Sequence, residues 1–147
     1  MKNSIALIGF MGTGKTAVGK ALAKKLNKEF VELDSLIEQR AGKSIPEIFQ
    51  QDGEIAFREL EIEVTKEVSR NKNLVIACGG GLVLNKINID RLRNDSIIVY
   101  LTASPRVLLK RVSGNGGERP LLNVADKVSE IRELLRFREP FYERAAD

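Results

Sequence analysis

The sequence has no histidine, no tryptophan and a single cysteine, Cys78. Without histidine, proton transfer by imidazole and histidine-ligated metal sites are excluded, so a general base has to be a carboxylate or a less usual group. A lone cysteine cannot form an internal disulfide, which fits a reducing compartment, and we interpret Cys78 as a small buried residue. With 5% aromatic residues, the chain offers no obvious stacking platform for single-stranded nucleic acid.

The sequence also lacks long hydrophobic runs and dense blocks of one charge. No run approaches the roughly 20 apolar residues of a membrane-spanning helix, and no signal-peptide cleavage pattern follows the short N-terminal run. We therefore expect a cytoplasmic protein without a membrane partner. The net charge of +4 comes from scattered basic residues and fits an anionic small molecule. Since no nucleic-acid recognition motif is present, we expect no nucleic-acid partner.

The 147 residues suit one domain, residues 1–147, in which strand and helix patterns alternate. Short apolar runs predict strands at 5–8, 30–33, 74–78 and 97–101. Helical patterns cover residues 15–26, 34–40, 45–51, 53–70, 104–114 and 126–138. In the first of these helices, Val18, Leu22 and Leu26 form one apolar stripe. The alternation predicts an α/β fold with a parallel sheet, in which ligands bind at the carboxyl ends of the strands.

The clearest motif is Gly9-Phe10-Met11-Gly12-Thr13-Gly14-Lys15-Thr16, which follows the first predicted strand and matches G-x-x-x-x-G-K-[ST]. Its glycines let several backbone N–H groups surround one anion, and the helix that begins there directs its positive end at the phosphates. Lys15 neutralises charge on the β- and γ-phosphates, and the Thr16 hydroxyl is placed to ligate Mg²⁺. The motif predicts a site for a nucleoside triphosphate.

Carboxylates and glycines follow two other predicted strands. Glu32 and Asp34 point the same way if both are extended, and one then suits a metal and the other an acceptor hydroxyl. A helix N-cap at Asp34 and a solvated strand end at Glu32 are the plainer interpretations. The run Gly79-Gly80-Gly81 lets a ligand touch bare backbone N–H groups, although a flexible turn also explains three glycines.

Three arginines, Arg58, Arg119 and Arg138, are candidates for anion binding. Arg119 lies in a glycine-rich stretch, and Arg138 lies near the expected end of the last helix, before Pro140. Arginine binds carboxylates and phosphates in a two-pronged manner. A surface arginine is more often solvated, so their spacing alone does not assign these three.

Taken in order, the motifs resemble those of the shikimate kinase family from about Lys2 to Asp147. They are the phosphate loop, Asp34-Ser35-Leu36-Ile37-Glu38, Ile48-Phe49, Gly53-Glu54, Phe57-Arg58, Gly79-Gly80-Gly81, Glu118-Arg119-Pro120-Leu121-Leu122 and Arg138-Glu139-Pro140-Phe141-Tyr142. The resemblance implies a three-layer αβα P-loop kinase fold with strand order 2-3-1-4-5, a substrate-binding region at about 34–61 and a mobile lid at about 114–124. It also implies a monomer that transfers the ATP γ-phosphate to the 3-hydroxyl of shikimate with Mg²⁺, in the pathway to chorismate and the aromatic amino acids.

The resemblance also assigns roles to individual residues. Asp34 would hold the acceptor hydroxyls and act as base or orienter, Arg58 and Arg138 would bind the shikimate carboxylate, and Arg119 would close over the phosphates. The expected catalytic residues are Lys15, Asp34 and Arg119. The expected ATP contacts are Gly12, Thr13, Gly14, Lys15, Thr16 (also on the metal), Ala17, Arg111 (against the adenine) and Arg119. The expected substrate contacts are Asp34, Arg58, Gly79, Gly80, Gly81 and Arg138.

The sequence departs from the family pattern at two places. The family usually has aspartate where this chain has Glu32, at a position associated with the metal, commonly through water. Family members also continue beyond Asp147 with a further strand, an adenine-contacting loop and a final helix. Without a fifth strand, the strand at 97–101 becomes a sheet edge, and we expect weaker ATP binding and a lower melting temperature than in a longer relative.

Two other functions stay open on the residues alone. A small kinase for gluconate or a nucleotide would share the phosphate loop without needing Arg58 and Arg138 to meet at one carboxylate. A non-catalytic ATP-binding module, impaired by the missing tail, would keep Lys15 and show no shikimate-dependent turnover. The retention of Asp34 and Arg119 argues against that module.

Overall fold

The computed structural model of the chain describes residues 2–102 and 127–147. The strands are β1 (Ser4–Ile8), β2 (Glu29–Glu32), β3 (Leu74–Ala77) and β4 (Ser96–Tyr100). The helices are α1 (Lys15–Leu26), α2 (Leu33–Ala41), α3 (Ile45–Gln51), α4 (Glu54–Val68), the 3₁₀ turn η1 (Leu82–Leu84), α5 (Lys86–Arg93) and α7 (Lys127–Ala145). Among these residues, no helix combines the length and the apolar character needed to cross a membrane.

The four strands form one parallel sheet in the order β2-β3-β1-β4. Leu7 in the central strand β1 pairs with Ala77 of β3 on one side and with Val99 of β4 on the other. This topology confirms the predicted α/β fold and its strand order. Because all strands run in the same direction, their carboxyl ends meet at one edge of the sheet, where the phosphate loop, Asp34 and the three glycines follow them.

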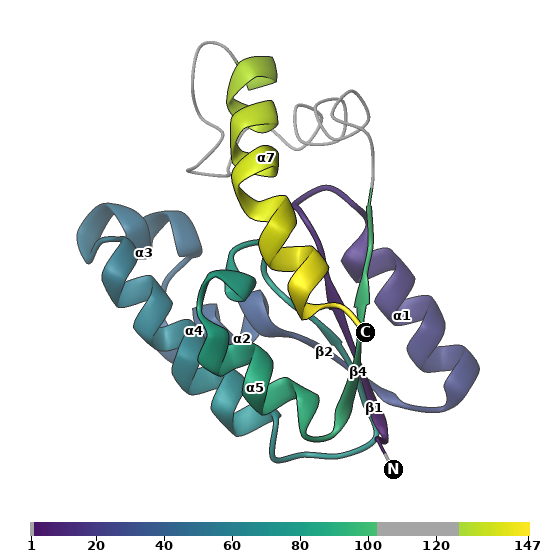
Figure 1. Cartoon of the computed structure of the whole chain (residues 1–147). Coiled ribbons are helices and arrows are strands. Elements are labelled where there is room, and N and C mark those ends of the chain that lie inside the picture. Colours follow the sequence, from purple (N-terminus) through teal and green to yellow (C-terminus); the bar gives the residue numbers. More distant parts are fainter. Residues whose placement is uncertain (1, 103–126) are drawn as a thin grey trace.

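Helices cover both faces of the sheet and give it three layers (Figure 1). On one face, Leu7 packs against Ala23 of α1. The other face carries the larger core, in which Ile8 packs with residues of α4 and α7 such as Val64 and Ile131. Neighbouring residues of β1 serve the two cores because successive side chains of a strand point to opposite faces.

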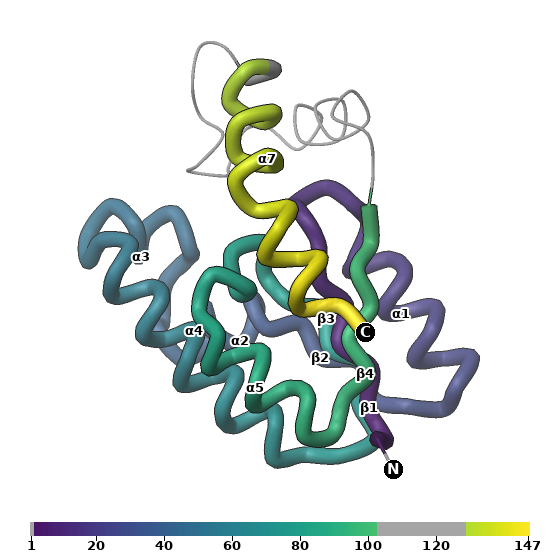
Figure 2. The backbone as a smooth tube through the Cα atoms, in the orientation of Figure 1, coloured from purple at the N-terminus to yellow at the C-terminus, as the bar shows by residue number. Residues whose placement is uncertain are grey.

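The segment α2–α4 carries a short helix, α3, that projects from the body of the molecule (Figure 2, left). A capping box begins α3: the Ser44 hydroxyl accepts the Glu47 N–H, and the Glu47 carboxylate accepts the Ser44 N–H. Pro46 lies in the first turn, where its missing N–H has no cost. Helices α3 and α4 form a helical hairpin, which we call the α3 hairpin. Ile48 of α3 and Phe57 of α4 anchor this hairpin because both are buried in the main core.

The helices differ from the predicted ones at two places. The pattern predicted no element for residues 82–93, where η1 and α5 lie, because the inner face of α5 includes the polar Asn88. The helix expected to end near Arg138 runs to Ala145, with Pro140 inside it. Pro140 removes one helical hydrogen bond, but burial of Tyr142 and Ala145 stabilises the turns beyond it. The helix predicted at 104–114 lies outside the described residues.

Only Leu22 of the apolar stripe predicted on α1 packs against the core. Val18 is 42% exposed and Leu26 is 43% exposed, while Gly19 and Ala23 are buried instead. A Cβ on Gly19 would come within 2.5 Å of the Phe30 ring. The helix therefore turns its smallest side chains toward the sheet, because only these allow such close packing.

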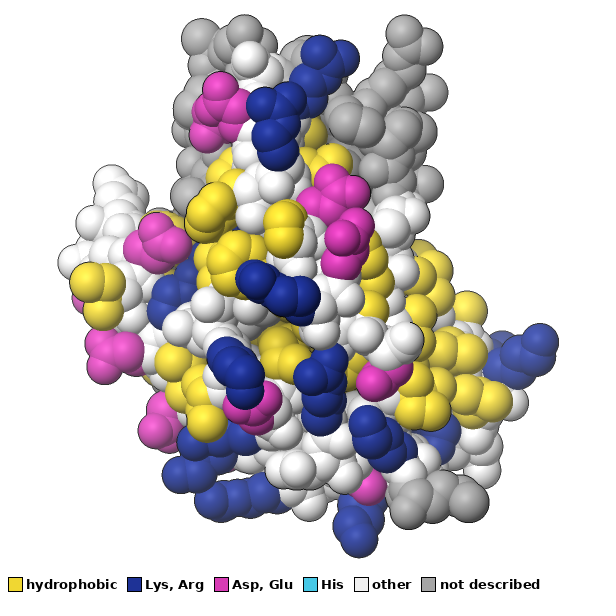
Figure 3. Space-filling model, viewed as in Figure 1, with side chains coloured by type: hydrophobic (Ala, Val, Ile, Leu, Met, Phe, Trp, Pro, Cys, Tyr) yellow, Lys and Arg dark blue, Asp and Glu magenta, His cyan; other side chains and the backbone are white. Residues whose placement is uncertain are grey.

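Strand β4 is the edge of the described sheet. Ile97 and Val99 are 46% and 38% exposed, and they lie on the same face as Leu101, which packs in the α1 layer. Figure 3 shows apolar side chains gathered on this side of the molecule, at the right. Asp147 occupies one position of the edge: its N–H donates to Ile98 O (2.9 Å), and its Oδ2 accepts the Ile98 N–H (2.7 Å).

Candidate active site

The phosphate loop joins β1 to α1 at the carboxyl edge of the sheet. Gly12 and Gly14 have φ values of +85° and +95°, a region that favours glycine, so the motif needs glycine at these positions. The Lys15 ammonium group donates to the carbonyl oxygens of Gly9 (2.7 Å) and Phe10 (2.9 Å). The positive charge is therefore held across the loop, beside the N-terminus of α1, where anions are favoured.

Side-chain oxygen atoms that could ligate a metal come together beside the phosphate loop, from α1, β2 and α2. The Glu32 carboxylate accepts hydrogen bonds from the Thr16 hydroxyl and, at 2.6 Å, from the Ser35 hydroxyl. Hydroxyl and carboxylate oxygens are ligands that Mg²⁺ prefers. Within residues 2–102 and 127–147, no group of three or more His, Cys, Asp or Glu side chains is placed to hold a metal. This donor set fits a Mg²⁺ ion that takes most of its ligands from phosphates and water.

Each glycine of the run 79–81, which follows β3, lies against a charged side chain. A Cβ added to Gly79 would lie 2.7 Å from Asp34 Oδ1, and one added to Gly80 would lie 3.5 Å from Arg138 Nη1. A Cβ added to Gly81 would lie 2.5 Å from Arg58 Nη1. Side chains from α2, α7 and α4 thus reach the backbone of one three-residue segment. Only glycine permits the two closest of these approaches.

Arg58, on α4, is held by carboxylates of its own helix. Its Nη1 is 3.1 Å from Glu61 Oε1, and its Nη2 is 3.4 Å from Glu54 Oε2. The Arg58 side chain is 13% exposed, whereas the Glu54 side chain is half exposed. Arg58 Nε is buried and has no hydrogen-bond acceptor in the described part of the chain. The two carboxylates therefore fix the direction of the guanidinium group, while its Nε–H can still donate a hydrogen bond to a ligand.

Arg138, on α7, is 3% exposed. Its Nε and Nη1 atoms are buried and have no hydrogen-bond acceptor among the described residues. The guanidinium group lies 6.0 Å from the centre of the Phe10 ring. Buried donors without acceptors cost free energy, about 1–3 kcal/mol each and more for charged groups. An anion that accepted these hydrogen bonds would recover that free energy.

Glu61 lies at the centre of this group and is 1% exposed. A Cβ on Gly79 would meet its Oε2 at 3.3 Å, next to Asp34. Burial raises the pKa of Glu61 to about 7, the Arg58 guanidinium opposes this shift, the Asp34 carboxylate adds to it and Arg138 opposes it. The charge of Glu61 therefore changes near neutral pH.

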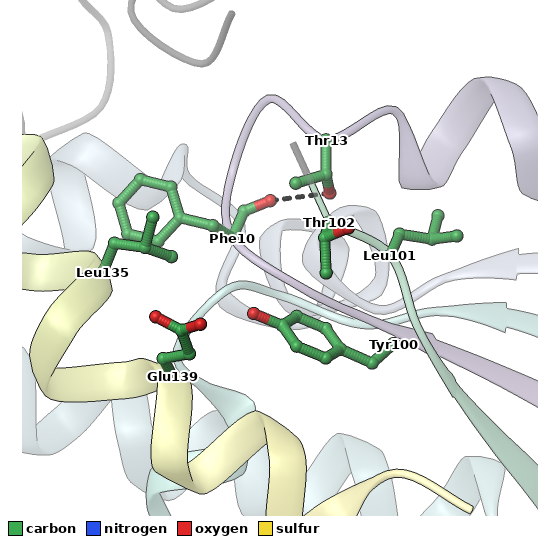
Figure 4. A pocket seen from close by; sticks show the side chains of 7 residues that line it. All are labelled: Phe10, Thr13, Tyr100, Leu101, Thr102, Leu135 and Glu139. Carbon is green, nitrogen blue, oxygen red and sulfur yellow. Dashed lines mark hydrogen bonds between the residues drawn. The ribbon is translucent and has the colours of Figure 1, made fainter. Parts of the chain in front are cut away.

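A small cavity of about 70 Å³ lies between the end of β4, the phosphate loop and α7 (Figure 4). Its lining residues are Phe10, Thr13, Tyr100, Leu101, Thr102, Leu135 and Glu139. The Thr13 hydroxyl donates to Phe10 O at 2.8 Å. The pKa of Tyr100 is raised mainly by burial, and the negative charges of Glu139 and Glu143 add to this shift. The cavity has room for a few water molecules and lies on the α7 side of the phosphate loop.

The family model described as shikimate kinase matches residues 11–147. The chain belongs to the shikimate kinase family. The shikimate kinase of Caldanaerobacter subterraneus subsp. tengcongensis is 52% identical over 147 residues, which are 100% of this chain and 84% of that protein. The shikimate kinase of Thermodesulfovibrio yellowstonii is 49% identical over 145 residues, 99% of this chain and 83% of that protein.

Solved structures agree with this assignment to the shikimate kinase family. Shikimate kinase from Acinetobacter baumannii, in complex with shikimate, superposes with a TM-score of 0.94 at 39% identity. The match covers 99% of this chain and 81% of that one. A gluconokinase from Sinorhizobium meliloti has a TM-score of 0.55 at 21% identity, covering 91% of this chain and 73% of that one, and this likeness shows the fold alone.

Most of the predicted site residues lie at the carboxyl edge of the sheet. The predicted substrate contacts converge on the glycine run, and the predicted ATP contacts from Gly12 to Ala17 lie on the phosphate loop and the first turn of α1. The N-cap interpretation of Asp34 is wrong, since α2 begins at Leu33 and Asp34 lies in its first turn. Helical geometry there also turns Asp34 away from Glu32. Arg111, Arg119 and the lid at 114–124 lie outside the described residues.

Sequence reasoning assigned no role to two residues that contact the glycine run. Glu61 and Tyr142 are both buried, and each follows a predicted arginine by one helical turn: Glu61 is three residues after Arg58, and Tyr142 is four residues after Arg138. Residues three and four apart on a helix are neighbours. That spacing was a usable signal for both, once the two arginines were assigned to helices.

The raised pKa of Glu61 predicts a pH dependence of folding. Between about pH 4.5 and 7 the folded chain keeps a proton on Glu61 that the unfolded chain releases, so stability falls as pH rises through this window. Glu61→Gln removes this dependence. We expect the free energy of unfolding of Glu61→Gln, relative to the original chain, to rise by up to about 3 kcal/mol between pH 4.5 and pH 8. Urea unfolding across this pH range measures it.

The control for this experiment is Glu59→Gln, an exposed carboxylate on the same helix. This substitution should leave the pH profile of unfolding unchanged. Parallel stability curves for Glu61→Gln and the original chain would show that Glu61 ionises normally in the folded protein.

Proposed function

We propose that this chain transfers the γ-phosphate of ATP to the 3-hydroxyl of shikimate, giving shikimate 3-phosphate and ADP. One observation carries the proposal: two arginines on different helices meet at the glycine run, Arg138, which is buried, and Arg58, whose side chain is 13% exposed. Arg58 and Arg138 both keep buried donors without acceptors in the described chain. Two guanidinium groups at one place suit a carboxylate, which accepts paired hydrogen bonds from arginine.

The spacing along the glycine run supports an acceptor that carries an acid at one end and a hydroxyl at the other. Arg58 lies at Gly81, and Asp34 lies at Gly79. Two residues of backbone span at most about 7 Å, which is comparable to the width of a small hydroxy acid. We assign to Asp34 the contact with the acceptor hydroxyls and the acceptance of the hydroxyl proton. The glycine backbone N–H groups are assigned to the substrate as well.

The phosphate loop supplies the other half of the proposed reaction. Phosphoryl transfer depends mainly on positioning and on neutralising charge. Lys15 is assigned to the β- and γ-phosphates, with Gly12, Thr13, Gly14 and Ala17 as further ATP contacts. Thr16, beside Glu32, would hold Mg²⁺, which neutralises charge on the transferring phosphate. Glu32 is one carbon longer than the aspartate usual in the family, and its contact with Thr16 supports a place beside the metal.

Further parts of the proposal rest on the family resemblance. Arg119 would approach the phosphates on a lid at about 114–124, and Arg111 would lie against the adenine. Residues 34–61 would form the substrate-binding region. We also propose a cytoplasmic monomer that acts in the biosynthesis of aromatic amino acids, where ATP is available and no partner subunit is required.

The test is ADP release with ATP and Mg²⁺, measured without acceptor and with shikimate, gluconate or nucleoside monophosphates. The proposal expects ADP release that depends on shikimate and exceeds the release with every other acceptor. Faster turnover with gluconate or a nucleotide would assign the chain to another small-molecule kinase class. ATP binding without turnover on any acceptor would identify a non-catalytic module.

A further inference from the structure

Tyr142 is the buried tyrosine of α7, and it joins this helix to the glycine run. The residue is fully buried, and its hydroxyl donates a hydrogen bond to Gly80 O. Its ring stacks on Tyr100 of β4, with ring centres 5.0 Å apart and an interplanar angle of 26°. The contact therefore connects the last helix, the edge strand and the segment after β3.

The hydroxyl of Tyr142 is a permanent donor. Burial raises the pKa of Tyr142 to about 12, although the Arg138 guanidinium opposes this shift. At neutral pH the phenol stays protonated, so the proton points to Gly80 O. The bond is partly buried, and hydrogen bonds inside a protein are stronger than in water.

The bond fixes one peptide plane of the glycine run. The carbonyl of Gly80 and the N–H of Gly81 belong to the same planar trans peptide, in which they point in opposite directions. A hydroxyl that holds the carbonyl therefore also sets the direction of the Gly81 N–H. Glycine has the widest choice of backbone angles, so a run of three glycines is not held in one conformation by its own side chains. The hydrogen bond from Tyr142 supplies that constraint from outside the run.

The same helix delivers Arg138 to the same glycine. Arg138 and Tyr142 are four residues apart on α7, so they lie on one face of the helix. A Cβ on Gly80 would meet Arg138 Nη1 at 3.5 Å. The end of α7 is anchored by Arg93, whose Nη2 donates to the carbonyls of Arg144 (2.9 Å) and Ala145 (2.8 Å). One rigid element thus sets both the arginine and the peptide that it faces.

We propose that Tyr142 is a positioning residue of the carboxylate site: by holding Gly80 O it sets the direction of the Gly81 N–H and its spacing from Arg138. This inference rests on the proposed function, because it assigns the Gly81 N–H and Arg138 to the substrate carboxylate. A purely structural tyrosine would contribute to stability and leave recognition of the carboxylate unchanged. The two roles therefore differ in what the hydroxyl does to substrate preference.

The experiment is Tyr142→Phe, which keeps the ring and its stacking and removes one hydroxyl. The kinetic constants are measured for ATP, for shikimate and for the methyl ester of shikimate, whose carboxyl group carries no charge. We expect KM for shikimate to rise about 5- to 10-fold, as for loss of one buried hydrogen bond, with kcat and KM for ATP within about 2-fold. The preference for shikimate over its ester should fall by the same factor.

The matched control is Ser4→Ala. Ser4 is buried at the opposite end of the sheet, and its hydroxyl accepts the Leu74 N–H at 3.0 Å, so this variant also loses one buried hydrogen bond. We expect it to lower the melting temperature by a similar amount and to keep the preference for shikimate over the ester. Calorimetric titration of shikimate without nucleotide gives a second readout, in which Kd of Tyr142→Phe rises by the same 5- to 10-fold.

A Tyr142→Phe variant that melts earlier yet keeps KM, Kd and the ester preference would overturn the inference. Failure of the proposed function has a different signature, since the original chain would then release no ADP in response to shikimate. The two failures are therefore distinguished by the original chain alone.

Discussion

Replacing Asp34 with asparagine is expected to lower kcat for shikimate phosphorylation by about 10²- to 10⁴-fold, the range typical for loss of a general base. Asparagine keeps the size and most hydrogen bonds of the side chain, but it cannot take the hydroxyl proton. Since the chain has no histidine, no imidazole can replace it. The Kd of ATP should stay within about 2-fold, because Asp34, on α2, lies against Gly79 and is not part of the phosphate loop.

Steady-state kinetics with shikimate, together with titration of ATP, checks this prediction. Asp52→Asn is the matched control: it is the same chemical change at an exposed carboxylate, which pairs with Lys43 at 2.6 Å on the α3 hairpin. It should leave kcat and Kd unchanged. If Asp34→Asn retained more than a third of the original kcat, Asp34 would only orient the acceptor and the proton would leave by another route.

Replacing Arg138 with methionine should weaken shikimate binding and stabilise the free protein at the same time. Arg138 is assigned to the substrate carboxylate, and removing one partner of a buried charge pair costs about 2–4 kcal/mol. KM for shikimate should therefore rise roughly 30- to 1,000-fold. Methionine fits the same space beside the Phe10 ring without a charge.

Arg138→Met is expected to stabilise the ligand-free protein because two hydrogen-bond donors of Arg138 have no acceptor among the described residues. Its Nε and Nη1 are buried without acceptors in the described chain, so the ligand-free fold carries the cost of a desolvated cation. Replacing such a charge with an apolar side chain often stabilises a protein by about 1–4 kcal/mol. Thermal unfolding without ligands should show a higher Tm for Arg138→Met than for the original chain.

Arg136→Met is the control, because Arg136 is exposed on the same helix. It should change neither KM nor Tm appreciably. A drop in Tm for Arg138→Met would mean that this arginine is a structural residue whose donors are satisfied in the ligand-free protein. An unchanged KM would remove Arg138 from the carboxylate site and leave Arg58 as the arginine assigned to it.

The sequence by itself determined the sheet, the phosphate loop and the family. The β1 run is apolar at every position from Ile5 to Ile8, so it had to be a strand covered on both faces. The loop that follows depends on glycine at φ values that other residues rarely adopt, and such a requirement is written directly in residue type. Local chemistry of this kind needs no knowledge of distant neighbours.

Sequence patterns predicted burial and helix ends less well where these depend on residues that are distant in the sequence. Val18, Leu22 and Leu26 had the spacing of a buried stripe, yet only Leu22 packs against the core. Gly19 takes the closest position to the sheet because the Phe30 ring lies there. Pro140 predicted the end of a helix, yet α7 continues because Tyr142 beyond it is buried. In both cases packing energy from distant residues outweighed a local preference of a few kcal/mol or less.

The tertiary structure alone decided which charged residues belong to the site. Arg58 and Arg138 are 80 residues apart in the chain and look like ordinary surface arginines, but both are drawn against the same three glycines. Glu61 lies outside the quoted motifs and Tyr142 ends one of them without an assigned role, so both acquire their roles from what faces them. Residue type fixes what a side chain can do, whereas burial and distance, which only the folded chain sets, decide whether it does so.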